Sequence, residues 1–103
     1  MNQKINEIEN EINSLILDLL GPIRSSKIID KTTFNKFYSL LNEVKQLMGG
    51  EVYIPRKLVG MLFYIYRTIA AESEHAKYSE PIFIATAKIE TYLDEILWDS
   101  PWK

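Results

Sequence analysis

The sequence contains no cysteine and a single histidine, His75. The absence of cysteine excludes a disulfide framework and thiolate metal sites. A carboxylate-bridged di-iron site in a helical bundle needs two Glu-x-x-His pairs and two further inward carboxylates. Glu72 and His75 form one such pair, but a chain with one histidine has no second pair. We therefore expect no metal and no cofactor, and interpret Glu72 and His75 as a solvated helix end.

The sequence also lacks a glycine-rich phosphate loop. Gly49-Gly50 is followed by Glu-Val-Tyr, without the Lys and Ser/Thr that hold a phosphate. A nucleophile must lie beside a histidine that a third group orients, and Ser73 and Ser79 are better explained as a surface residue and a helix cap. We expect no catalytic residues, so the protein is predicted to be no enzyme and to work by recognition.

No excess of positive charge exists, since 12 basic residues are scattered among 14 acidic ones and the net charge is −2. Nucleic-acid binding rests on a basic face that neutralises phosphates. We therefore expect no nucleic-acid partner.

A membrane-spanning run and a signal peptide are missing as well. The apolar run at residues 58–66 is bounded by Arg56, Lys57 and Arg67, whereas a span takes about 20 apolar residues. The first residues, MNQKINEIENE, are polar and acidic, unlike a signal peptide. These features predict a cytoplasmic protein with at most peripheral membrane association.

Four stretches carry apolar residues at helical spacing. They predict helices at about residues 3–20, 33–48, 55–76 and 80–97, followed by a tail at 98–103. The fold class expected for four helices with short links is all-α, an antiparallel up-and-down four-helix bundle. At 103 residues, the whole of 1–103 is predicted to be one domain.

Glycine, proline and helix-capping residues predict the ends of these helices. Gly21-Pro22 is expected to end the first helix, and Thr32 or Thr33 to cap the second. Gly49-Gly50 is expected to form a tight corner. Ser79 is expected to cap the fourth helix.

The stretch at residues 54–71 carries two apolar stripes instead of one. Leu58, Met61, Leu62, Ile65 and Ile69 form the first stripe, and Val59, Phe63, Tyr66 and Ala70 form the second. A helix that faces one partner needs a single stripe. We therefore expect a central helix covered on both sides, with Met61 and Ile65 in the core.

Aromatic residues concentrate in the second half of the sequence. Phe63, Tyr66 and Tyr92 occur at helical spacing and are expected to be core packing. Trp98 and Trp102 follow the last periodic residue, with Pro101 between them. Two interpretations stay open for these tryptophans: a lid folded back on the bundle, or anchors presented to a partner.

This layout resembles the immunity proteins for pediocin-like (class IIa) bacteriocins. The resemblance rests on the helix FNKFYSLLNEVKQL and on the run VYIPRKLVGMLFYIYRTIAAESEHAKYSEPIFIATAKIETYLDEIL, and it covers roughly residues 3–97. In that run an extended Tyr-x-Pro leads into an aromatic helix, a short polar turn and a final amphipathic helix.

The resemblance implies a cytosolic four-helix bundle that protects a cell from a pore-forming antimicrobial peptide. The implied partner is a membrane permease of the mannose phosphotransferase system with bound bacteriocin, and specificity is implied to lie in the C-terminal half. Within that region, exposure and chemistry select as candidate partner-binding residues Arg67, His75, Lys77, Tyr78, Trp98, Trp102 and Lys103. The alternative is a small helical adaptor or inhibitor that neutralises another toxin or binds a soluble protein.

Overall fold

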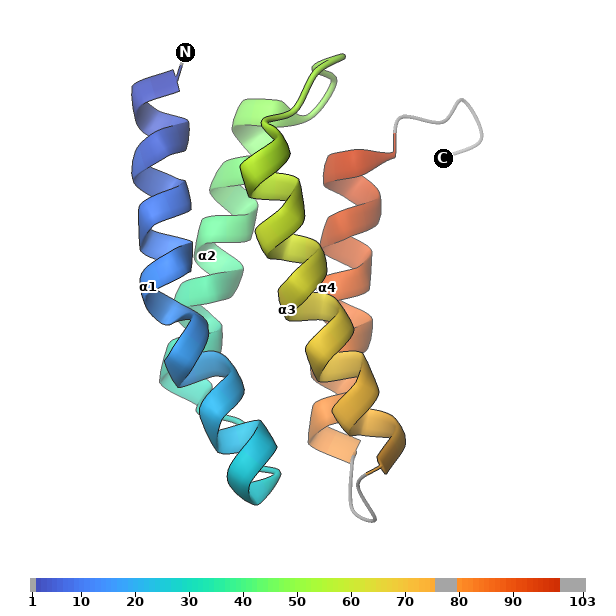
Figure 1. Cartoon of the computed structure of the whole chain (residues 1–103). Coiled ribbons are helices and arrows are strands. Elements are labelled where there is room, and N and C mark those ends of the chain that lie inside the picture. Colours follow the sequence, from blue (N-terminus) through green and yellow to red (C-terminus); the bar gives the residue numbers. More distant parts are fainter. Residues whose placement is uncertain (1, 76–79, 99–103) are drawn as a thin grey trace.

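The computed structural model describes residues 2–75 and 80–98, which form four helices (Figure 1). α1 spans Asn2–Ser26, α2 spans Lys31–Met48, α3 spans Arg56–His75 and α4 spans Glu80–Leu97. No strand occurs within these described ranges. The predicted all-α class is therefore confirmed for this part of the chain.

Each helix packs against two others, so the four close into a ring. α1 packs on α2 and α3, and α4 also packs on α2 and α3. Each helix turns an apolar stripe toward a shared interior. The buried residues are Ile5, Ile8, Ile12, Leu19, Leu20 and Ile23 of α1, Phe34, Phe37, Leu40, Leu41, Val44 and Met48 of α2, Leu58, Leu62, Ile65 and Ile69 of α3, and Ile82, Ala85, Ile89, Leu93 and Ile96 of α4.

The first helix does not end at Gly21-Pro22, so this prediction is wrong. α1 continues to Ser26 with Pro22 inside it, although proline removes one helical hydrogen bond. The extra turn buries Ile23 completely, which contributes on the order of 1.5 to 3 kcal/mol. The helix ends instead at Ser26. The next residue, Lys27, has a left-handed φ of 56°, and its N–H donates to the Ile23 carbonyl at 3.0 Å.

The cap of α2 also differs from the prediction. Asp30, not Thr32 or Thr33, is the N-cap, and its carboxylate accepts a hydrogen bond from the Thr33 N–H at 3.3 Å. The corner after α2 forms as expected. Gly50 has a φ of 87°, and a Cβ on Gly49 would lie 2.6 Å from the Lys45 carbonyl oxygen. Glycine at these two positions therefore suits the turn.

The prediction that α3 is covered on both sides is wrong. The first stripe is buried at Leu58, Leu62, Ile65 and Ile69, but Met61 is only partly buried. In the second stripe Val59, Tyr66 and Ala70 are half-buried and Phe63 is 49% exposed. α3 occupies one place in a ring, where two neighbours cover one stripe. The second stripe therefore lies partly at the surface.

Ion pairs between helices lie at the surface and add little to this packing. Lys4 of α1 pairs with Glu43 of α2 at 3.4 Å, and Lys45 of α2 pairs with Glu95 of α4. All four side chains are partly exposed, and such pairs each contribute about 0 to 1 kcal/mol. Among the helices that the structure describes, none is both long and apolar enough to cross a membrane.

We predict that Ile65→Ala lowers the free energy of unfolding by about 2 to 5 kcal/mol, because Ile65 is completely buried and its loss leaves a cavity. Met61→Ala should cost less, since Met61 is partly solvated. Urea denaturation followed by circular dichroism measures both. Leu17→Ala is the control: Leu17 is 83% exposed, so its change should stay within about 0.5 kcal/mol. Equal costs for Ile65→Ala and Leu17→Ala would contradict the placement of α3.

Candidate protein-binding site

The structure describes two of the seven predicted partner-binding side chains. Arg67 is exposed on α3, and Trp98 is exposed directly after α4. His75 is the last residue of α3, but its side chain lies outside the described part of the chain. The other four predicted residues also lie outside the described residues: Lys77, Tyr78, Trp102 and Lys103.

Trp98 is held at the end of α4 by its backbone. Its N–H donates to the Asp94 carbonyl at 3.0 Å, which continues the helical hydrogen-bond pattern by one residue. The side chain is 62% exposed. A lid would bury the ring against the helices, so the lid interpretation does not hold for Trp98.

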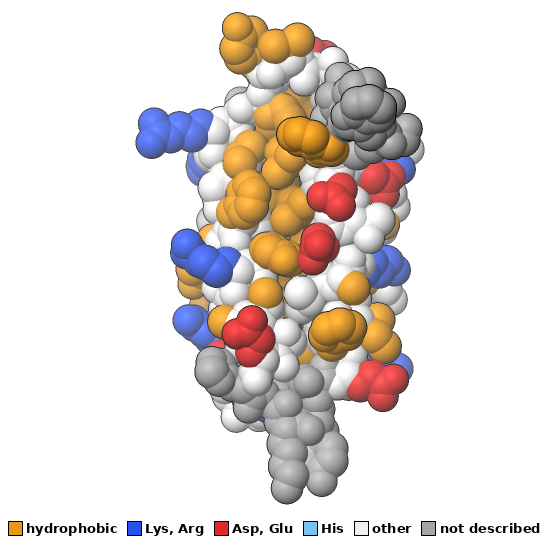
Figure 2. All heavy atoms as spheres, turned by 90° about the vertical axis from the view of Figure 1, so that its right-hand side faces the viewer, with side chains coloured by type: hydrophobic (Ala, Val, Ile, Leu, Met, Phe, Trp, Pro, Cys, Tyr) orange, Lys and Arg blue, Asp and Glu red, His pale blue; other side chains and the backbone are white. Residues whose placement is uncertain are grey.

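Trp98 lies at a groove of about 250 Å³ between α3 and α4. Three rings line it, those of Phe63, Tyr66 and Trp98, together with Leu93 and Leu97. Glu90 and Asp94 are the charged residues that line it. Figure 2 shows this side of the molecule, where a hydrophobic strip runs between acidic side chains on one border and Lys and Arg side chains on the other.

Helical spacing brings these side chains into line. Phe63 and Tyr66 are three residues apart on α3, so they share one face of that helix. On α4 the groove residues recur at intervals of three and four, from Glu90 through Leu93 and Asp94 to Leu97. The packing of α3 against α4 then sets the two faces side by side.

A hydrogen bond links the two walls of the groove. The Tyr66 hydroxyl donates to Oε2 of Glu90 at 3.1 Å. Partial burial raises the pKa of Tyr66, and its hydrogen bond to Glu90 and the negative charges of Glu90 and Asp94 raise it further. The hydroxyl therefore keeps the proton that it donates to the Glu90 carboxylate up to a higher pH than an ordinary tyrosine does.

The sequence missed most of this groove. Phe63 was expected to be core packing and is half exposed, while Tyr66 and Tyr92 are half-buried. The signal was present in the second stripe of α3, which is more apolar surface than two neighbours can cover. Glu90 and Asp94 carry no such signal, because nothing in the sequence distinguishes them from other exposed acidic residues.

Other hollows lie between α1 and α2 and between α2 and α4. The hollow between α1 and α2, of about 420 Å³, is lined mainly by polar and charged residues such as Glu11, Lys36 and Ser39. The one between α2 and α4, of about 440 Å³, includes Tyr38, which stacks on Tyr92 at a ring distance of 6.0 Å. Lys88 lies over the Tyr38 ring at 4.2 Å from its centroid.

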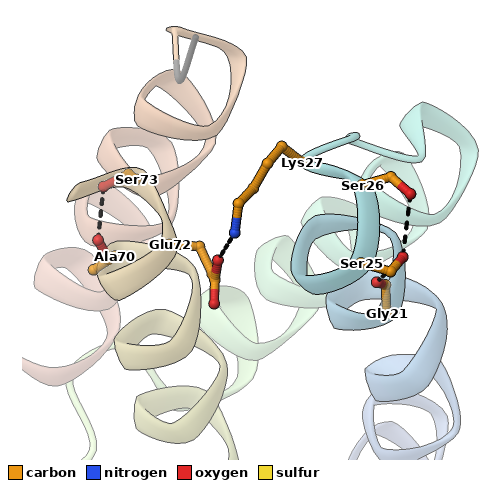
Figure 3. Close-up of polar contacts among 7 residues, drawn as sticks. All are labelled: Gly21, Ser25, Ser26, Lys27, Ala70, Glu72 and Ser73. Atoms are coloured by element: carbon orange, nitrogen blue, oxygen red, sulfur yellow. Dashed lines mark hydrogen bonds and ion pairs between the residues drawn. The ribbon is translucent and has the colours of Figure 1, made fainter. Parts of the chain in front are cut away.

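Glu72 takes part in an interhelical contact at the end of α1. Figure 3 shows the Lys27 side chain reaching from there to the Glu72 carboxylate on α3 as an ion pair. Nearby, Ser73 donates a hydrogen bond to the Ala70 carbonyl at 2.7 Å. The described residues contain no cluster of three or more His, Cys, Asp or Glu that could hold a metal.

Comparison of the chain with protein families, with curated proteins and with solved structures finds no match.

We predict that Trp98→Ala changes the free energy of unfolding by less than about 1 kcal/mol, because the ring is mostly solvated. A buried tryptophan would cost about 3 to 5 kcal/mol on the same change. Thermal and urea unfolding of the variant decide between these values. A loss of the larger size would restore the lid interpretation.

A second prediction concerns Tyr38, whose pKa is raised to about 12 by burial and, to a lesser extent, by the charge of Tyr92. Below pH 10 the folded and unfolded states both hold the proton. Between about pH 10 and 12 the unfolded state loses it first, so the free energy of unfolding falls as pH rises.

Tyr38→Phe keeps the ring and its contact with Lys88 but removes this titration. Urea unfolding of both proteins at about pH 9 and about pH 11.5 should show a smaller fall for the variant. Lysines titrate in both proteins and cancel in the comparison. Identical falls would contradict the raised pKa.

Proposed function

We propose that the protein is a non-enzymatic immunity protein that protects a cell from a pore-forming, pediocin-like bacteriocin. It acts from the cytosol on the complex of the bacteriocin with its receptor, a membrane permease of the mannose phosphotransferase system. The observation that carries the proposal is the solvent-exposed aromatic groove between α3 and α4. It lies in the C-terminal half, the region that the family resemblance links to specificity.

The proposal includes the antiparallel up-and-down form of the four-helix bundle. Figure 1 supports this form, because the course of the chain alternates in direction from each helix to the next. The pairing of helices gives further support, since α1 packs on α2 and α3 packs on α4, as two helical hairpins would. In such a bundle the groove-forming helices α3 and α4 belong to one hairpin.

The groove has the composition of a protein-binding site more than of a catalytic one. Tyrosine and tryptophan are enriched at interface hot spots, because their rings supply contact area with few rotatable bonds. Apolar side chains gathered on one exposed face indicate a docking surface more than a scatter of single exposed residues does. This composition equally suits the alternative, an adaptor or inhibitor of a soluble protein.

The decisive experiment is expression in a bacteriocin-sensitive strain, followed by challenge with a panel of pediocin-like peptides. The proposal expects survival against at least one peptide, at concentrations that kill cells with an empty vector. Absence of protection against the whole panel, with the protein folded and expressed, would favour the alternative of a soluble toxin or protein partner.

We further predict that the groove is required for protection. Phe63→Ala and Trp98→Ala should each reduce the protective concentration range by about tenfold or more, since one hot-spot residue contributes about 2 kcal/mol or more to binding. Phe83→Ala is the matched control, because Phe83 is 65% exposed but lies outside the groove. Undiminished protection by both groove variants would exclude the groove as the docking site.

A further inference from the structure

We infer that the groove between α3 and α4 receives an amphipathic helix that carries Lys or Arg along the edge facing α4. This deepens the proposed function, from which it takes only that this groove binds a protein. The inference starts from charge. Glu90 and Asp94 are exposed on α4 and line the groove, and no Lys or Arg is among the residues that line it.

The apolar floor suits one face of a helix. Phe63 and Tyr66 of α3 and Leu93 and Leu97 of α4 lie along the two helices. Figure 2 shows an elongated hydrophobic strip on this side of the molecule, and such a strip matches the stripe that an amphipathic helix presents at intervals of three and four residues.

The polar groups of the groove are arranged for cations. The Tyr66 hydroxyl holds the Glu90 carboxylate in place, so less ordering is needed when a cation arrives. Trp98 is 62% exposed at the end of α4, and an exposed tryptophan ring is the side chain best suited to a cation–π contact. These features support a basic edge on the partner beside α4.

The α3 side of the groove, opposite the carboxylates of α4, determines the orientation of the partner. Arg67 follows Phe63 by four residues on α3, so it lies one turn along the same face. Arg67 is exposed and does not line the groove. With a basic residue on the α3 side and carboxylates on the α4 side, the partner's basic edge is directed to α4.

Charge also disfavours two other occupants. A second copy whose twofold axis runs across the groove would bring Glu90 and Asp94 toward the same carboxylates of its mate, and like charges across an interface weaken it. An anionic bilayer would meet the same repulsion, because its surface attracts basic segments.

The test uses two synthetic peptides of 18 residues or so, long enough for five helical turns. Both have leucines at helical spacing; lysine fills the remaining positions in one and glutamate in the other. Isothermal titration calorimetry at low and moderate salt measures their affinity for the full-length protein. The inference expects the lysine peptide to bind, and to bind more tightly than the glutamate peptide.

Two double variants, each of which removes two negative charges, distinguish binding at the groove from general electrostatic attraction to the protein. Glu90→Gln/Asp94→Asn should weaken binding of the lysine peptide by about three- to tenfold and reduce its salt dependence. Glu90→Gln keeps an oxygen that the Tyr66 hydroxyl can donate to. Glu7→Gln/Asp18→Asn is the control, since both residues are exposed on α1, and it should stay within about twofold.

Phe63→Ala and Phe83→Ala test the apolar floor in the same way, with loss of affinity expected only for Phe63→Ala.

Amide chemical shifts of the unaltered protein give a measurement that needs no variant. On addition of the lysine peptide, the largest changes should fall at residues 63–67 and 90–98.

Four results would overturn the inference: no binding of the lysine peptide, equal binding of both peptides, equal losses in the groove and α1 double variants, or self-association through the groove in sedimentation velocity. Its failure differs from failure of the proposed function. Protection that depends on Phe63 without binding of the lysine peptide would reject only the cationic helix. Groove-specific binding without protection against any bacteriocin would reject only the immunity function.

Discussion

The burial of one apolar stripe from each helix is the interaction on which the rest of the structure depends. The chain has no cysteine to cross-link it, and the interhelical ion pairs lie at the surface, where they contribute little. Phe34 and Phe37 of α2 are almost completely buried, as are the apolar stripe residues of the other three helices. Helix ends, corners and surface pairs then take positions that this interior allows.

Sequence patterns predict a helix best where it carries a single apolar stripe and that stripe is buried in the bundle. The spacing of Phe34, Phe37, Leu41, Val44 and Met48 predicts a buried face of α2, and all five are buried. Helix ends are harder to predict, because local signals compete with tertiary burial. Gly21-Pro22 is a strong local stop, yet burial of Ile23 favours another turn. Asp30 and Thr33 are both good cap residues, and only the position of the link decides between them.

The candidate site follows from the same constraint. A helix in a ring of four meets two neighbours, and those neighbours cover about one stripe. α3 carries two stripes, so Phe63 and part of Tyr66 remain at the surface, where α4 completes a groove. The prediction from sequence included Trp98, because it follows the last periodic residue. It did not include Glu90 or Asp94, whose role depends on how α3 and α4 are aligned.

This division separates stability from recognition. Leu62 and Ile65 lie on the face of α3 that is turned to the bundle interior, where other helices pack on them, so their replacement destabilises the fold. Phe63 and Trp98 contact solvent over much of their surface, and changes there act mainly on what the groove binds. Phe63 lies on a different face of α3 from Leu62 and Ile65, and Trp98 lies at the end of α4. Residues of the groove can therefore change while the buried residues of the interior are kept. A bundle of this kind can therefore present different binding surfaces on one stable frame.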